Sequence, residues 1–173
     1  MPDATSRATA VVLSGRLYVA GGDDCDKLQM WDGTAWTLKA DLPAARHDAA
    51  SVAVDGKMWV IGGVVQGEFE GTASVIIYDP DADSWTTGVP LPSPRCDCRA
   101  VALGGVVHVI GGLIENDSGM LLNDDDEVTT LPPPLWYMNG AWAELPSLES
   151  SAYTREHRVN HAEGHQAASL LLG

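Results

Sequence analysis

Short apolar segments separated by turn residues run along most of this chain. One phrase, a hydrophobic stretch that ends in a glycine pair, occurs as GRLYVAGG, GKMWVIGG and GVVHVIGG. Another apolar stretch precedes each phrase across a turn such as Asp-Gly or Gly-Gly, and these dipeptides supply the positive φ that two-residue hairpin loops need. Each phrase therefore predicts a β-hairpin. The glycine pairs are Gly21-Gly22, Gly62-Gly63 and Gly111-Gly112.

Two aromatic residues, with turn formers between them, follow each glycine pair and predict a second hairpin. Two hairpins in a unit of about 50 residues describe a four-stranded sheet, the unit of a propeller blade. A large aromatic on a late strand fills the wedge between adjacent sheets, so the three tryptophans that end these pairs are expected in the core. The pairs are Trp31 and Trp36, Tyr78 and Trp85, and Tyr137 and Trp142.

The glycine pair, the spaced aromatics and the LPAAR or LPSPR segment before the next hairpin resemble the kelch repeat. The resemblance runs from about residue 8 to residue 146. It implies an all-β fold, a kelch-type β-propeller arc of about three four-stranded blades at roughly 8–46, 47–95 and 96–146. A β-sandwich is the alternative, because its strands also recur at short regular intervals.

Three blades are too few for a closed ring, since propellers close with about four to eight. Residues 147–173 are expected to form a degenerate or truncated fourth repeat, or a tail. The incomplete ring leaves three interpretations: a fragment of a larger propeller, which we favour, two copies that close a six-bladed ring, or a truncated product.

Charge and composition narrow the classes of partner. The 173 residues include 10 Lys and Arg against 24 Asp and Glu, for a formal net charge of −14, which disfavours nucleic acid and anionic membranes. The first ten residues, MPDATSRATA, have no apolar core of a signal peptide, and no apolar run approaches the length of a membrane span. Three cysteines do not indicate a disulfide framework. We expect a soluble protein in the cytoplasm.

Arg46 and Arg95 occupy matching places in LPAAR and LPSPR. In kelch substrate adaptors, which these segments resemble, the arginine at this place faces the mouth of the ring and holds acidic peptide groups. A planar guanidinium suits that task because it donates two hydrogen bonds to one carboxylate. The alternative is an arginine that satisfies backbone carbonyls between blades. The third unit continues as SLESS and has no matching arginine, so a complete ring of arginines is not expected.

Other candidate residues are weaker. The connections at 23–30, 64–77 and 113–136 differ in length. The third carries the acidic run 123–127, which indicates either a contact with a basic partner or a solvated loop. His157, His161 and His165 recur every four residues, but Gly164 opposes the helix that a metal site would require. Cys96 and Cys98 are expected to be buried and inert. We expect no metal, no cofactor and no catalytic residue.

The function predicted from these patterns is a non-catalytic protein–protein interaction module, either a scaffold or a substrate-recognition fragment. The expected partners are another protein and a second copy of this chain that completes the ring. The alternative is a fragment of a propeller enzyme that acts on sugars, epimerase-like or galactose-oxidase-like, since these enzymes also resemble kelch propellers. Such a site needs acid and base groups or metal ligands in a central pocket.

Overall fold

The computed structural model describes residues 1–113 and 135–145. Every regular element in these two ranges is a β-strand. The strands are β1 Thr9–Leu13, β2 Arg16–Ala20, β3 Leu28–Trp31, β4 Trp36–Leu38, β5 Arg46–His47, β6 Ala50–Val54, β7 Lys57–Ile61, β8 Val64–Val65, β9 Val75–Asp79, β10 Ser84–Thr87, β11 Arg99–Leu103, β12 Val106–Ile110, β13 Leu135–Met138 and β14 Ala141–Glu144.

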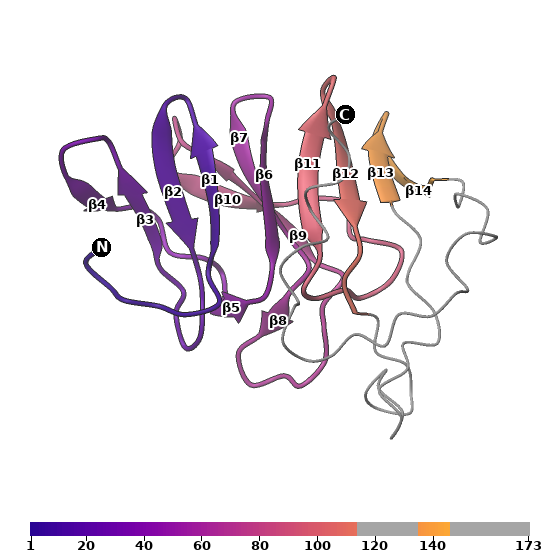
Figure 1. Cartoon of the computed structure of the whole chain (residues 1–173), viewed down its shortest axis with the longest axis horizontal. Coiled ribbons are helices and arrows are strands. Elements are labelled where there is room, and N and C mark those ends of the chain that lie inside the picture. The colour runs from indigo at the N-terminus through magenta and orange to yellow at the C-terminus, as the bar shows by residue number, and fades with distance from the viewer. Residues whose placement is uncertain (114–134, 146–173) are drawn as a thin grey trace, which may run out of the picture.

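The strands form three four-stranded sheets and a two-stranded sheet of β5 and β8, and neighbouring strands within each sheet are antiparallel. We call β1–β4 blade 1, β6, β7, β9 and β10 blade 2, and β11–β14 blade 3. In Figure 1 the first strands of the blades, β1, β6 and β11, lie side by side, and the other strands of each blade extend outward from them. The predicted all-β propeller arc of three four-stranded blades is confirmed. The three sheets lie within the three predicted blade segments; the domain limits themselves, and the tail at 147–173, stay a prediction.

Two-residue turns join the first two strands of every blade, as the dipeptides predict. Ser14 and Gly15 have φ values of 52° and 74°, and Asp55 and Gly56 have 50° and 71°. Both central residues are thus left-handed, the geometry of the type I′ turn that matches the twist of an antiparallel hairpin. These turns place the first strand's end and the second strand's start at one rim of the arc. The longer connections to the third strand therefore lie at the opposite rim.

Two hydrophobic clusters join the blades. We call the sheet face that looks toward the next blade in the sequence the forward face, and the opposite one the backward face. Leu13, Tyr18 and Met30 on the forward face of blade 1 pack with Met58 and Tyr78 on the backward face of blade 2. The second cluster repeats this between blades 2 and 3, with Val52, Val54, Ile61, Val75, Cys98, Val107, Val109 and Leu135. Blade 2 is therefore covered on both faces.

The predicted aromatic pairs lie directly opposite one another across the two outer strands of each blade. Ring centroids are 5.5 Å apart for Trp31 and Trp36, 5.2 Å for Tyr78 and Trp85, and 5.1 Å for Tyr137 and Trp142. Trp85 and Trp142 are half-buried against the two inter-blade clusters, so they contribute to the core as expected. Trp36 packs against neither cluster.

Each of the two packed tryptophans also makes a polar link to the blade before it. The Trp85 indole N–H donates to the carbonyl of Ala40 at 2.9 Å, and the Trp142 N–H donates to the carbonyl of Val89 at 2.9 Å. Both acceptors follow the outermost strand of the preceding blade. The repeated tryptophan therefore fixes one blade to its predecessor by packing and by a hydrogen bond.

Several predicted features lie outside the described residues: the acidic run at 123–127, the three histidines at 157, 161 and 165, and the segment after Leu145. Within the described ranges no helix is long and apolar enough to span a bilayer.

Candidate functional site at the rim where the inner strands begin

One residue of each blade marks the rim at which the inner strands begin. Arg7, Asp48 and Asp97 each stand two residues before β1, β6 or β11, and all three are left-handed, with φ between 52° and 57°. Hydrogen bonds connect them in series: the Asp48 N–H donates to the Arg7 carbonyl at 3.1 Å, and the Asp97 N–H donates to the Asp48 carbonyl at 2.9 Å. We call this series the rim ladder. It holds the three inner strands at a fixed spacing.

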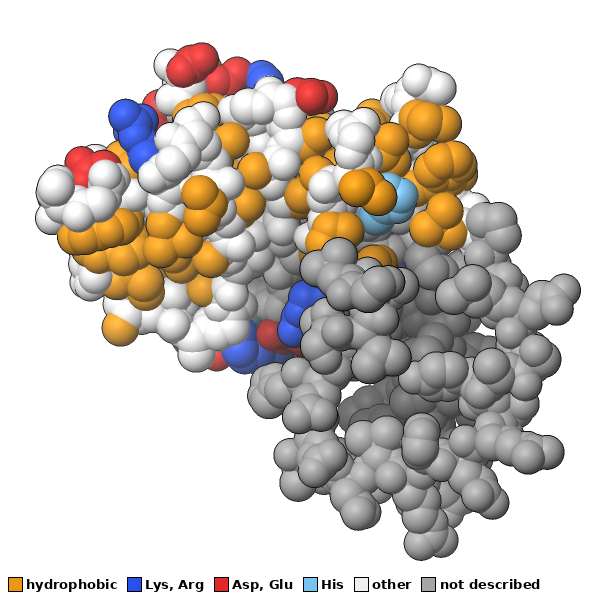
Figure 2. Space-filling model, turned by 45° about the horizontal axis from the view of Figure 1, so that its top comes forward, with side chains coloured by type: hydrophobic (Ala, Val, Ile, Leu, Met, Phe, Trp, Pro, Cys, Tyr) orange, Lys and Arg blue, Asp and Glu red, His pale blue; other side chains and the backbone are white. Residues whose placement is uncertain are grey.

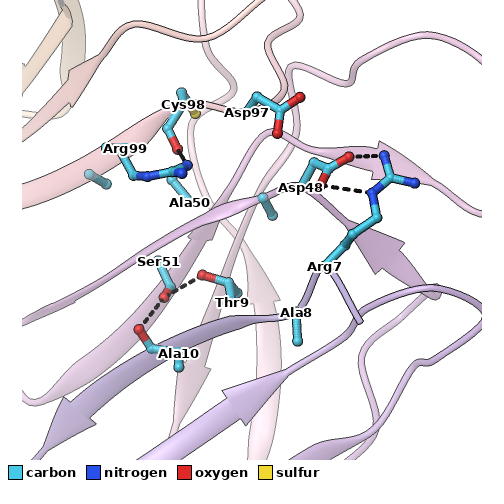
Figure 3. Close-up of a pocket in the computed structure, with 12 residues that line it drawn as sticks. Arg7, Ala8, Thr9, Ala10, Asp48, Ala50, Ser51, Asp97, Cys98 and Arg99 are labelled. Carbon is cyan, nitrogen blue, oxygen red and sulfur yellow. Dashed lines mark hydrogen bonds and ion pairs between the residues drawn. The ribbon is translucent and has the colours of Figure 1, made fainter. Parts of the chain in front are cut away.

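The rim ladder borders a hollow of about 430 Å³ that residues from all three blades line. Figure 3 shows the side chains of Arg7 and Asp48 directed toward each other, with Asp97 beside them. Between β1 and β6 the Thr9 hydroxyl donates a hydrogen bond to the Ser51 hydroxyl at 2.6 Å, and the Ser51 hydroxyl donates to the Ala10 carbonyl at 3.1 Å. Charged and hydroxyl groups, rather than an apolar pocket, thus meet where the blades converge.

Electrostatics differ between the two carboxyl groups of the ladder. Partial burial of Asp48 favours its neutral form, but hydrogen bonds from Arg7 and His47 outweigh this and hold the pKa of Asp48 below its ordinary value. Asp97 has the opposite balance, because burial and the neighbouring Asp48 charge raise the pKa of Asp97. Asp97 makes no side-chain hydrogen bond or ion pair with the residues that the structure describes.

We expect Asp48→Asn to lower the free energy of unfolding by about 1 kcal/mol near neutral pH, because it removes the charge that Arg7 and His47 stabilise. A carboxyl group with a lowered pKa stabilises the fold above its unfolded-state pKa and loses this contribution as the pH falls through its folded-state pKa. The difference between wild type and variant should therefore shrink as the pH falls from about 7 to about 3. Urea unfolding at several pH values measures it, and Asn preserves the left-handed backbone. A difference that does not change with pH would contradict this account.

The predicted binding residue Arg46 lies between blades 1 and 2 and is buried, with 6% of its surface exposed. Its Nη1 donates to the carbonyls of Gly62 at 2.9 Å and Ser74 at 3.2 Å, and its Nη2 donates to the Ser74 hydroxyl at 2.6 Å. Its own carbonyl accepts the N–H of Gly22 at 2.7 Å. Burial lowers the pKa of Arg46. This arginine thus links the glycine pair of one blade to the glycine pair of the next.

Arg95 repeats this arrangement one blade further on. It is 1% exposed, its Nη1 donates to the carbonyl of Gly111 at 3.0 Å, and its carbonyl accepts the N–H of Gly63 at 2.8 Å. The two arginines therefore bond to backbone carbonyls between blades, one of the two roles considered from the sequence. Whether either guanidinium also binds a ligand stays a prediction.

The functional residues Arg7, Asp48 and Asp97 were not predicted from the sequence. A signal was present, since each stands at the same place in its repeat, before a small residue and an apolar strand. Asp also tolerates the left-handed conformation better than most residues do. Cys96 and Cys98 are both buried, as predicted. Among the described residues no group of three His, Cys, Asp or Glu side chains could hold a metal ion.

Comparison with known proteins gives three similarities. Residues 45–92 match the family model of the Kelch motif. Mouse (Mus musculus) Kelch-like protein 35 is 30% identical over a 90-residue alignment that covers 48% of this chain and 14% of that protein. The solved structure of YjhT matches with a TM-score of 0.72 at 18% identity, over 84% of this chain and 51% of that chain. The present chain thus spans a small part of the mouse protein and about half of the solved chain, and the structural likeness concerns the fold alone.

Proposed function

Because residues 45–92 match the Kelch motif and the chain folds as three blades of a propeller, we propose that it acts as a non-catalytic module that binds another protein. The observation that carries the proposal is the rim at which the inner strands begin. There, charged side chains of three different blades surround an open hollow, and the connections from β2 to β3 and from β7 to β9, which differ in length, lie at the same rim. Binding specificity in repeat folds commonly resides in such connections, which vary while the scaffold stays uniform.

The connection between β8 and β9 gives this rim its most exposed hydrophobic side chain. Phe69 has 95% of its surface exposed, and the exposed carboxylates of Glu68 and Glu70 flank it. Aromatic side chains are common anchors of protein interfaces, where they fill a pocket on the partner. The flanking charges favour a pocket edged by Lys or Arg, and the net charge of −14 favours a basic partner as well.

In this proposal Arg46 and Arg95 have a structural role at the rim. They connect the glycine pairs from which the variable connections start, so they fix the positions of those connections. We also propose an intracellular place of action, because three cysteines, an odd number, do not indicate a disulfide framework. The class of protein partner includes a second copy of this chain.

The proposal is tested with the whole chain immobilised as bait for proteins of the source cell, compared with Phe69→Ser and a control. The control is Val89→Ser, which removes an exposed apolar side chain (40% exposed) beyond the outermost strand of blade 2. We expect proteins that wild type and Val89→Ser capture and that Phe69→Ser captures at least tenfold less, because an aromatic anchor contributes on the order of 2 kcal/mol. A purified captured protein should show the same order of affinity and should bind more weakly at high salt. Equal capture by all three forms would contradict binding through this rim.

A further inference from the structure

Blade 3 exposes apolar side chains that the other two blades bury. Leu103 is 73% exposed, whereas the matching residues Leu13 and Val54 are 5% and 8% exposed. Ile110 is 44% exposed, while the matching Ile61 of blade 2 is fully buried. Val101 and Met138 on the same forward face are also exposed. Apolar side chains that are exposed at a place where the repeat normally packs indicate a missing partner sheet.

Blade 1 has the opposite open face. Val12 and Leu38 on its backward face are 64% and 49% exposed. Trp36 on this face donates no hydrogen bond within the described residues, whereas Trp85 and Trp142 at the same place in their blades each bond to the preceding blade. The middle of this face is covered, since Val19 and Gln29 are buried there and Gln29 exchanges bonds of 3.0 and 2.8 Å with Asp3. In Figure 2 hydrophobic side chains gather at both ends of the arc.

The rim ladder also ends in complementary groups. It begins at Arg7, whose N–H makes no bond with described residues, and it ends at the carbonyl and the unpaired carboxyl group of Asp97. A further step of the ladder would join the N–H of a second Arg7 to the carbonyl of Asp97. It would also bring a second guanidinium toward the carboxyl group of Asp97, whose charged form burial disfavours.

We propose that a second copy of this chain closes the ring, with the forward face of blade 3 packed on the backward face of blade 1 of the other copy. Two such junctions, related by a two-fold axis, produce six blades and leave no open face. Both junctions repeat the packing that already joins blades 1, 2 and 3 within the chain. The arc also matches 51% of a solved chain, so that two arcs correspond to its length. This assembly does not depend on the binding of another protein at Phe69.

The test is the solution mass of the full chain by light scattering across a dilution series. We expect twice the chain mass of 18.3 kDa for the wild type. Val12→Asp and Leu103→Asp should each halve the measured mass, because each places a charge in both junctions. Both side chains are exposed within one copy, so neither change disturbs its folding. Phe69→Asp alters an exposed apolar side chain that lies outside both junction faces, so this variant should keep the dimer mass.

Mixing the two variants distinguishes this arrangement from other dimers. The Val12→Asp copy retains an intact forward face and the Leu103→Asp copy an intact backward face, so an equimolar mixture has one wild-type junction and should recover dimer mass. A monomeric wild type, or larger assemblies, would overturn the proposal. So would dissociation by one variant but not the other, which would indicate pairing of like faces. Phe69→Ser that remains a dimer and loses its partner would support both proposals separately.

Discussion

Replacing Gly62 with alanine is expected to destabilise the chain by about 4 kcal/mol or more. Gly62 has a φ of 64°, and a Cβ built on it would lie well inside contact distance of the Arg95 carbonyl oxygen. That carbonyl cannot move away, because it accepts the Gly63 N–H at 2.8 Å. The change therefore combines backbone strain with the displacement of the link between blades 2 and 3.

Gly56→Ala separates these two contributions. Gly56 has a similar φ of 71°, but a Cβ there meets nothing within 4 Å. We expect it to cost about 1 kcal/mol, the strain of a left-handed alanine alone. Urea unfolding of both variants measures the difference. Equal losses would show that the approach of the Arg95 carbonyl does not restrict this position.

Arg46→Ala is expected to cost about 3 to 5 kcal/mol. The side chain is buried and donates to two carbonyls and one hydroxyl, so its loss removes the donor to the Gly62 carbonyl between blades 1 and 2 and opens a cavity. The loss of cooperativity should also be visible as a lower m-value if the blades separate before they unfold.

Two further variants serve as comparisons for Arg46→Ala. Arg16→Ala removes an exposed arginine at the opposite rim and should change stability by less than about 0.5 kcal/mol. Arg46→Lys keeps the charge but not the planar fork, so it should recover only part of the loss. If Arg46→Ala is as mild as Arg16→Ala, the guanidinium does not join the blades and a role in ligand binding becomes the better explanation.

Most of the fold could be predicted because its determinants are local in the sequence. The hairpin turns at Ser14-Gly15 and Asp55-Gly56 and the opposed aromatics Tyr78 and Trp85 specify strands through short-range geometry. The glycine pairs were predictable as strand ends. Their partners were not, because the bond from Arg46 to Gly62 connects residues of successive repeats, and only the packing of blades brings these together.

The candidate site was less predictable for the same reason. The sequence singled out Arg46 and Arg95 by their repeated place, but both a ligand and a carbonyl accept hydrogen bonds from a guanidinium. Arg7 and Asp48 carry opposite charges at the same place in two repeats, so a search for identical residues passes over them. What these positions share is a left-handed backbone conformation, which a sequence specifies only weakly outside glycine.

The three blades differ in how many of their faces are packed, and this difference determines which strands unfold first. Blade 2 has a cluster on each face, whereas blades 1 and 3 each have one. In an array where every unit contacts only its neighbours, stability is a sum of unit and junction terms, so the ends fray before the centre. Amide protons of β7 and β9 would then exchange only in global unfolding, and those of β4 and β14 through local opening. A ring without ends would abolish this gradient, and protection would become uniform around the axis.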